Sequence, residues 1–231
     1  MSARALPFES AVATGRGDDG TTGLLFGGDR IRKDDVRTEA YGTVDELIAA
    51  LGMARADLGL KQQYGVLPPS FAGLADLILR FQRELFVVGA ELATNPTDEA
   101  RAKQQDGVTR VSAEMVDGVD AVLREQEARI ELPREFVVPG ETRVSASIEV
   151  ARTVARRAER RAVTLATVDT ALADGYLLPY LNRLADLLWI LARFAEQAEA
   201  RSATAARPGR RGSRTQPGTQ PETSDTERSL E

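Results

Sequence analysis

The chain has 231 residues, 42% of them hydrophobic, with a formal net charge of −5 and neither cysteine nor histidine. This inventory excludes disulfides, zinc sites built from cysteine and histidine, and nucleophiles activated by a histidine base. The acidic balance offers no general attraction for nucleic acid, and no apolar segment approaches the roughly 18 residues of a membrane span. We therefore expect a cytoplasmic protein with no nucleic-acid or membrane partner, whose chemistry uses carboxylates, arginine, lysine, backbone amides or a cofactor.

The predicted elements follow one another from a flexible N-terminus, residues 1–13, through one folded domain, residues 14–200. Residues 14–33 are rich in glycine and threonine, so we expect an ordered loop or short extended segment there. Beyond them, apolar residues recur mostly at spacings of three and four, which predicts helices. The predicted helices span about 35–58, 69–94, 112–126, 145–168 and 173–200. Their length and amphipathicity predict an all-α fold, a helical bundle.

The C-terminal segment, residues 201–231, is rich in Ser, Thr, Pro, Gly and Gln and lacks an apolar period. Such a composition cannot bury enough apolar surface to offset the entropy of ordering, which predicts a disordered tail. The tail carries six arginines and four acidic residues. We expect a solvated extension rather than a binding arm.

The stretch ARTVARRAERRAV, residues 151–163, places five arginines in thirteen residues. At about 100° per residue, one side of this helix is apolar and is expected to face inward: Val154, Ala155, Ala158, Ala162 and Leu165. A polar stripe lies beside it: Arg152, Arg156, Glu159 and Arg160. The last predicted helix is almost wholly apolar except for a stripe of its own, with Trp189 on the same side: Asn182, Asp186 and Arg193. The stripes fit either solvated charged faces or two faces of a site or a subunit interface.

The stretch TGRGDDGTTG, residues 14–23, has the Gly-x-Gly-x-x-Gly spacing of a dinucleotide-binding loop. No clear strand precedes it and no helix follows it, and Thr21 stands where a Walker loop requires lysine, so both motifs are rejected. Glycines still let backbone amides approach an anion closely, and Lys33 could add a point charge. The loop taken alone fits an anion site or an ordinary glycine-rich turn equally well.

Five segments in order resemble the PduO-type ATP:cob(I)alamin adenosyltransferases: TGRGDDGTTGLLFGGDRIRKDD, AYGTVDELIAALGMARA, FQRELFVVGAELAT, FVVPGETRVSASIEVARTVARRAERRAV and YLNRLADLLWILARFAE. The resemblance covers roughly residues 14–198. It implies a ferritin-like, up-and-down five-helix bundle with an N-terminal nucleotide loop. It also implies a homotrimer with active sites between subunits, and transfer of the 5′-deoxyadenosyl group of ATP to cob(I)alamin, giving adenosylcobalamin and triphosphate.

The resemblance also assigns residues to the site. Those implied to bind the nucleotide, with Mg²⁺, are Thr14, Gly15, Arg16, Gly17, Thr22, Gly23, Lys33, Arg156, Glu159, Arg160 and Asn182. Arg156 matches the family's essential phosphate-binding arginine. Asp45 and Arg152 match a salt bridge between subunits that supports the corrin site. Phe136 matches an aromatic residue that covers the lower face of the corrin and displaces its axial ligand, and Asp186 lies near that site. No protein metal ligand is implied.

The chain departs from the family pattern at two positions near these motifs. Ile48 stands where relatives usually have asparagine, and Glu149 where many have histidine. Two extra residues also separate the arginine motif from YLNRLAD. Two other functions stay open: a non-catalytic ATP or cobalamin carrier or sensor of the same fold, and a helical interaction protein that uses the arginine stripe. A reductase and an adenosylcobalamin-dependent acceptor enzyme are possible partners of a transferase.

Overall fold

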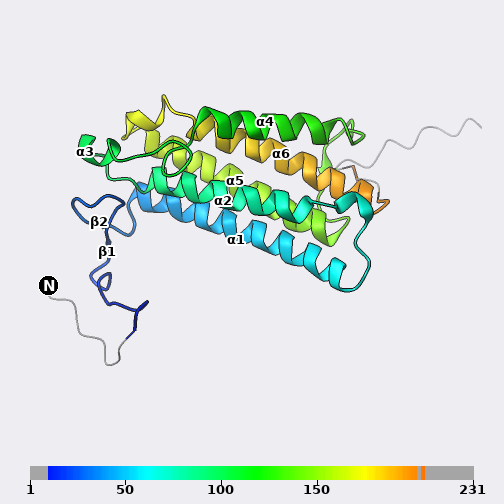
Figure 1. The fold of residues 1–231 in the computed structure, drawn as a ribbon, viewed down its shortest axis with the longest axis horizontal. Helices are drawn as coiled ribbons and strands as arrows, with labels where there is room; N and C mark the ends of the chain where they lie inside the picture. Colours follow the sequence, from blue (N-terminus) through cyan, green and yellow to red (C-terminus); the bar gives the residue numbers. More distant parts are fainter. Residues whose placement is uncertain (1–9, 202–203, 206–231) are drawn as a thin grey trace, which may run out of the picture.

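The computed structural model describes residues 10–201 and 204–205, and these residues are mostly helical (Figure 1). The helices are α1 (Val36–Gln63), α2 (Leu74–Leu92), α3 (Asp98–Arg101), α4 (Ala113–Glu127), α5 (Arg143–Ala166) and α6 (Leu177–Ala198). Two 3₁₀ turns, η1 (Pro69–Phe71) and η2 (Thr170–Leu172), precede α2 and α6. Four two-residue strands complete the description: β1 (Thr21–Thr22), β2 (Ile31–Arg32), β3 (Val137–Val138) and β4 (Thr204–Ala205). The prediction of a mostly helical chain is confirmed.

The five long helices lie side by side, and successive ones run in opposite directions along the long axis of the molecule (Figure 1). Helix α1 packs against α2 and α5, α5 packs against α6, and α6 packs against α4. The hydrophobic core runs between these helices. No helix in the described part of the chain is long and apolar enough to cross a membrane.

Helix α5 is central because its inward face is small. Four of the five side chains predicted to face inward are buried, and three of these are alanines: Ala155, Ala158 and Ala162; Val154 is only partly buried. Alanine side chains let neighbouring helix backbones approach closely, which allows α1 and α6 to pack on two sides of α5. The helix begins with a capping box, in which the Thr142 hydroxyl accepts from the amide of Ser145 at 3.1 Å.

The N-terminal segment forms a short hairpin beyond the end of the bundle at which α1 begins (Figure 1). Strands β1 and β2 pair antiparallel, and Leu25 ties the segment to the end of α2 through its backbone. The Leu25 amide donates to the carbonyl of Ala93 at 2.9 Å, and the Leu25 carbonyl accepts from the amide of Asn95 at 3.2 Å. The side-chain amide of Asn95 also donates to the Gly27 carbonyl at 2.9 Å. Gly28 has φ of +90°, and an added Cβ would lie 2.1 Å from Asn95 Nδ2, so only glycine fits there.

A buried ionic network holds the same end of the bundle together. Arg37 on α1 donates to the carbonyls of Leu92 and Thr94, at 2.9 and 3.1 Å, and to Asp169 at 2.5 Å. The other oxygen of Asp169 accepts from Arg101 on α3. The network therefore joins α1, the end of α2, α3 and the connection between α5 and α6 at the place where the N-terminal hairpin is attached.

The C-terminal segment returns to the bundle at β4. This strand pairs antiparallel with β3, with Val137 opposite Ala205 and Val138 opposite Thr204. These two residues lie in the segment for which the sequence predicts disorder. The rest of that prediction, and that of a flexible N-terminus, falls largely on residues 1–9, 202–203 and 206–231, which lie outside the described residues.

Candidate functional site

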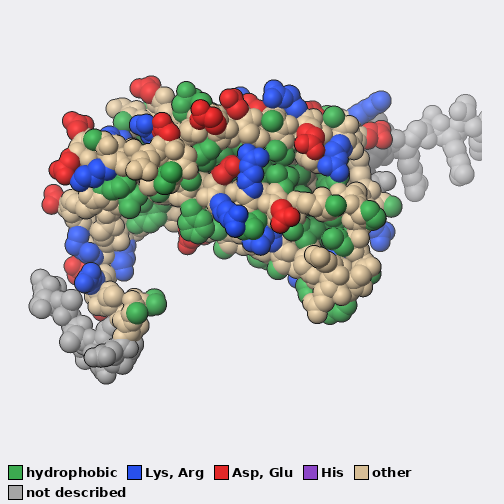
Figure 2. All heavy atoms as spheres, in the orientation of Figure 1, with side chains coloured by type: hydrophobic (Ala, Val, Ile, Leu, Met, Phe, Trp, Pro, Cys, Tyr) green, Lys and Arg blue, Asp and Glu red, His purple; other side chains and the backbone are tan. Residues whose placement is uncertain are grey.

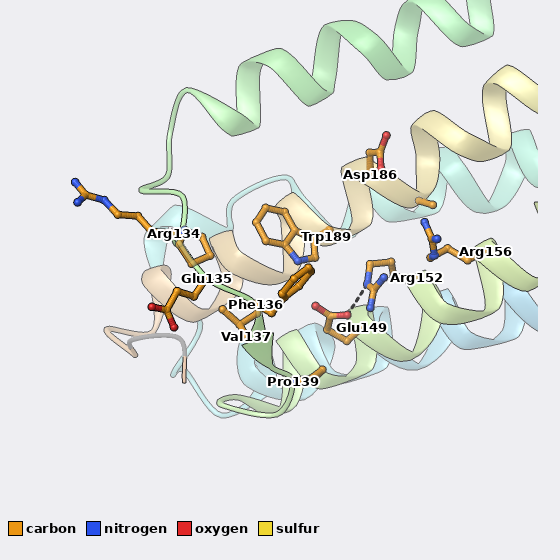
Figure 3. A pocket seen from close by; sticks show the side chains of 12 residues that line it. Arg134, Glu135, Phe136, Val137, Pro139, Glu149, Arg152, Arg156, Asp186 and Trp189 are labelled. Atoms are coloured by element: carbon orange, nitrogen blue, oxygen red, sulfur yellow. Dashed lines mark hydrogen bonds and ion pairs between the residues drawn. The ribbon is translucent and has the colours of Figure 1, made fainter. Parts of the chain in front are cut away.

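A pocket of about 680 Å³ lies between α5, α6 and the segment that connects α4 to α5 (Figure 3). It is lined by Pro133, Arg134, Glu135, Phe136, Val137, Pro139, Glu149, Arg152, Arg156, Ala185, Asp186 and Trp189. The rings of Phe136 and Trp189 lie close to one another at its centre, whereas Arg134 extends away from the other side chains (Figure 3). The pocket thus combines two aromatic surfaces with cations from α5. It brings together four residues that the sequence assigned to the site: Phe136, Arg152, Arg156 and Asp186.

A chain of buried charges underlies one wall of the pocket. Glu149 is 3% exposed and accepts from Arg152 Nε at 2.6 Å. Its second carboxylate oxygen lies 3.2 Å from Arg193 Nη2, and the same nitrogen donates to Glu196 at 2.7 Å. Arg193 shares a predicted stripe with Asp186, but Asp186 is exposed and Arg193 is fully buried, with its guanidinium 5.7 Å from the centre of the Trp189 ring. Arg193 therefore supports the pocket from below.

The five arginines of residues 151–163 on α5 differ in their partners. Arg157 and Arg161 reach acids on α1, Glu46 and Glu39 respectively, with 3.0 Å between Arg161 Nε and the Glu39 carboxylate. Arg152 pairs with Glu149, as described above. The other two have no carboxylate partner among the described residues: Arg156 and Arg160. Helix α5 therefore carries two cations that the described part of the chain does not neutralise.

The N-terminal loop is held in shape by its own side chains. Asp19 accepts from the hydroxyl and the amide of Thr21, at 2.7 and 2.9 Å, and the hydroxyl bond is the main cause of the lowered pKa of Asp19. Arg30 donates to the Thr21 hydroxyl at 2.7 Å and to the Arg16 carbonyl at 2.8 Å. An added Cβ at Gly17 would lie 2.8 Å from Lys33 Nζ, so the ammonium group rests against the loop backbone. The structure thus brings Lys33 and the glycine loop together.

The loop and the pocket are separate within one chain. The loop is attached at the end of the bundle where α5 finishes, whereas Arg156 lies ten residues before that end, or about 15 Å along the helix. Asp45 is exposed on α1, and like Glu159, Arg160 and Asn182 it does not line the pocket. The residues assigned to the nucleotide therefore do not form one closed site in the described part of a single chain.

Sequence reasoning missed several residues that shape these two places. It singled out Glu149 only as a departure, and it assigned no role to Arg30 or Asn95, which hold the loop. The signal for Glu149 and Arg193 was present: each is a charged residue at a buried position of a predicted helix, and such groups are costly unless paired. Their pairing could not be read from the sequence because they lie on different helices.

A sequence profile of the cobalamin adenosyltransferases matches residues 12–195. The chain belongs to the cobalamin adenosyltransferase family. It is similar to a corrinoid adenosyltransferase of Citrobacter freundii, with 39% identity over 185 residues that cover 80% of this chain and 94% of that relative. It is also similar to the corrinoid adenosyltransferase PduO of Salmonella typhimurium, with 38% identity over 200 residues, or 85% of this chain and 53% of that relative, so the match spans about half of PduO.

Solved structures of the family have the same fold. A variant of a PduO-type ATP:corrinoid adenosyltransferase from Lactobacillus reuteri, complexed with cobalamin and ATP, superposes with a TM-score of 0.70 at 25% identity. That match covers 85% of this chain and 96% of the other. The family assignment made from the sequence motifs is confirmed.

Proposed function

We propose that the protein transfers the 5′-deoxyadenosyl group of ATP to cob(I)alamin, giving adenosylcobalamin and triphosphate, in the cytoplasm. The observation that carries this proposal is the sorting of the α5 arginines. Arg157 and Arg161 are neutralised by α1, whereas Arg156, at the edge of the pocket, and Arg160, one turn further on, have no carboxylate partner among the described residues. Two such cations one turn apart suit a polyphosphate, which arginine binds through charge-assisted hydrogen bonds.

The pocket itself suits the corrinoid. Phe136 is 90% exposed and its ring lies beside that of Trp189 in the pocket, so a flat macrocycle would meet aromatic surface there (Figure 3). In this position the Phe136 ring would keep water and the lower axial ligand away from cobalt. Asp186 and Arg152 supply polar groups at the rim for the amide side chains of the corrin.

The nucleotide loop requires a second subunit in this proposal. The hairpin that carries Thr14, Thr22 and Lys33 extends beyond the end of the bundle (Figure 1). We propose a homotrimer of five-helix bundles in which the loop of one subunit meets Arg156 and Arg160 of its neighbour, with Glu159 and Asn182 beside them. Exposed Asp45 would reach one terminal nitrogen of Arg152 across the same interface, since among the described residues Arg152 engages a carboxylate only through Nε.

The reaction needs no nucleophile or base from the protein. Cobalt(I) donates an electron pair to C5′ of ATP, the cobalt–carbon bond forms, and the bond from C5′ to the triphosphate oxygen breaks. Lys33, Arg156 and the amides of the loop would stabilise the charge that builds on the departing triphosphate. Among the described residues no group of three acidic side chains could hold a metal ion, so we expect Mg²⁺ to enter with ATP and assign no step to a metal bound by the protein. A reductase must supply cob(I)alamin, and an adenosylcobalamin-dependent enzyme would receive the product.

The test is a direct assay of the purified protein with ATP, Mg²⁺ and chemically reduced cobalamin, followed by the absorbance change from cobalt(I) to alkylcobalt. Arg156→Ala should lower kcat/KM by about 10²–10³, the usual cost of one lost donor to a developing charge. The matched control is Arg157→Ala, because Arg157 is the next residue on α5 but is paired with Glu46. Binding of ATP and cobalamin without conversion would refute the transferase and favour a carrier or sensor.

A further inference from the structure

Glu149 is an unusual group to find beside this pocket. It is a carboxylate that is 3% exposed, on a helix whose other inward-facing side chains are mostly alanine, valine and isoleucine. Its hydrogen bond to Arg152 engages only Nε of that arginine (Figure 3). The two terminal nitrogens of Arg152 have no carboxylate or carbonyl partner among the described residues, and the side chain remains 23% exposed on the pocket side. Glu149 therefore holds the guanidinium at Nε and leaves its two terminal nitrogens, which form the fork of the side chain, available to bind another group.

Arg193 allows Glu149 to remain charged in the core. Its Nη2 lies 3.2 Å from Glu149 and 2.7 Å from Glu196, and the arginine is 1% exposed. Within the described part of the chain, Nε and Nη1 of Arg193 have no hydrogen-bond partner, so the position of this side chain depends on these two carboxylates and on the ring of Trp189. Burying an ion pair in a protein core adds little to the free energy of unfolding, because the desolvation penalty cancels most of the electrostatic attraction between the two charges. The cluster therefore points to a role other than stability.

The two sides of the cluster lie on different helices. Arg193 belongs to α6 and Glu149 to α5, and the pocket opens between these helices. The Glu149–Arg193 pair thus sets the spacing at the pocket wall and orients Arg152 relative to it. A shift of either helix would therefore move the terminal nitrogens of Arg152.

We propose that Glu149, held by Arg193, is the positioning residue for Arg152: it orients the guanidinium so that one terminal nitrogen meets Asp45 of the neighbouring subunit and the other points toward the edge of the corrinoid. This inference rests on the proposed function. Glu149 also neutralises part of the charge of Arg152, so the fork suits neutral amide oxygens, which the corrin periphery carries, better than a phosphate. Glu149 thereby keeps the triphosphate on Arg156 and Arg160 and the corrinoid on Arg152.

The experiment is a double-mutant cycle on the full chain, with KM measured separately for cob(I)alamin and for ATP. The four proteins are wild type, Glu149→Gln, Arg152→Ala and the double variant. Glutamine keeps the size of the side chain and removes its charge. The matched control is Glu199→Gln, because Glu199 is a partly buried carboxylate directly after α6 that pairs with Lys61 at 2.6 Å and does not line the pocket.

Glu149→Gln should raise the KM for cob(I)alamin about tenfold, the factor expected from weakening one charge-assisted hydrogen bond. The KM for ATP should not change, and the control should change neither value. In the Arg152→Ala background, Glu149→Gln should have no further effect on the corrinoid KM, because a positioning residue acts only through its target. Additive effects, or equal changes in both KM values, would show that Glu149 is merely structural and would overturn the inference.

A second variant covers the case in which Glu149→Gln does not fold. Glu149→Asp keeps the charge that Arg193 requires but withdraws the carboxylate by one methylene from Arg152. It should show the same selective rise in corrinoid KM, and a wild-type value would overturn the inference. A wild-type protein that does not convert cob(I)alamin would instead refute the proposed function, and the inference with it.

Discussion

Replacing Asp169 with asparagine tests the buried network at the end of the bundle that carries the nucleotide loop. The side chains of Asp169 and Arg37 are 5% and 6% exposed, and among the described residues this carboxylate is the only one that pairs with both Arg37 and Arg101. Asparagine has the same shape but leaves these cations without an anion. Removing one partner of a buried ion pair costs about 3–5 kcal/mol. Because Arg37 also donates to the carbonyls of Leu92 and Thr94, it retains some compensation, and we expect a loss of about 3 kcal/mol.

The assay is urea unfolding followed by far-ultraviolet circular dichroism, with Asp34→Asn as the control. Asp34 pairs with Arg32 on the surface, where the two side chains are 68% and 79% exposed, so its loss should not change the unfolding midpoint. The m-value should be the same in all three proteins, because the surface exposed on unfolding is unchanged. A loss below about 1 kcal/mol for Asp169→Asn would refute the reasoning, since it would mean that water or the two carbonyls compensate Arg37 fully.

Three further predictions concern other parts of the chain. Burial raises the pKa of Glu91 to about 6, above its ordinary 4.5, so the folded protein binds this proton more tightly than the unfolded chain and loses stability as pH rises through that range. The free energy of unfolding of Glu91→Gln should therefore rise relative to that of wild type between these pH values, and the difference should reach about 2 kcal/mol above pH 6 in urea titrations. A difference that does not depend on pH would contradict the raised pKa of Glu91. Gly17→Ala would place a methyl group against Lys33 Nζ and should raise the KM for ATP severalfold in the adenosyl-transfer assay without lowering Tm. An unchanged KM would show that Lys33 does not contribute to ATP binding. A chain truncated after Arg201 loses β4, whereas one truncated after Ala205 keeps it. Because β4 pairs with β3, which directly follows Phe136, only the shorter chain should show a raised KM for the corrinoid. Equal KM values for the two chains would exclude a role for β4.

The helices were predictable where a long apolar period exists, and their ends were not. The inward face of α5 follows from alanines spaced three and four apart, and the structure buries them as expected. The helix predicted to begin at Pro69 instead opens with the 3₁₀ turn η1, and Gly73, with φ of +79°, separates this turn from α2. Helix α3 has four residues capped by Thr97, which is too short for a period to register.

The site was predictable in its residue types and less so in its geometry. Arg193 lies seven residues after Asp186, so a helical wheel places both on one face of α6. That face is exposed at Asp186 but buried at Arg193, where Glu149 of α5 pairs with the guanidinium. A wheel describes one helix alone, and what covers each turn depends on neighbours that are distant in the sequence. Only the motif resemblance placed Phe136 beside the arginine helix, because no local pattern links a loop phenylalanine to it.

The arrangement of charges on α5 explains how an acidic chain can present a focused cationic site. Six arginines on one helix would attract anions along its whole length, with little selectivity. Glu39 and Glu46 of α1 neutralise the side of α5 that faces α1, and Glu149 pairs with Arg152 at the pocket lined by Phe136 and Trp189. What remains is a pair of cations one helical turn apart, between the pocket and the end of the bundle from which the glycine loop extends. The acidic residues of this chain thus do not oppose anion binding; under the proposed function they restrict it to the position where the triphosphate would leave the reacting carbon beside the corrinoid.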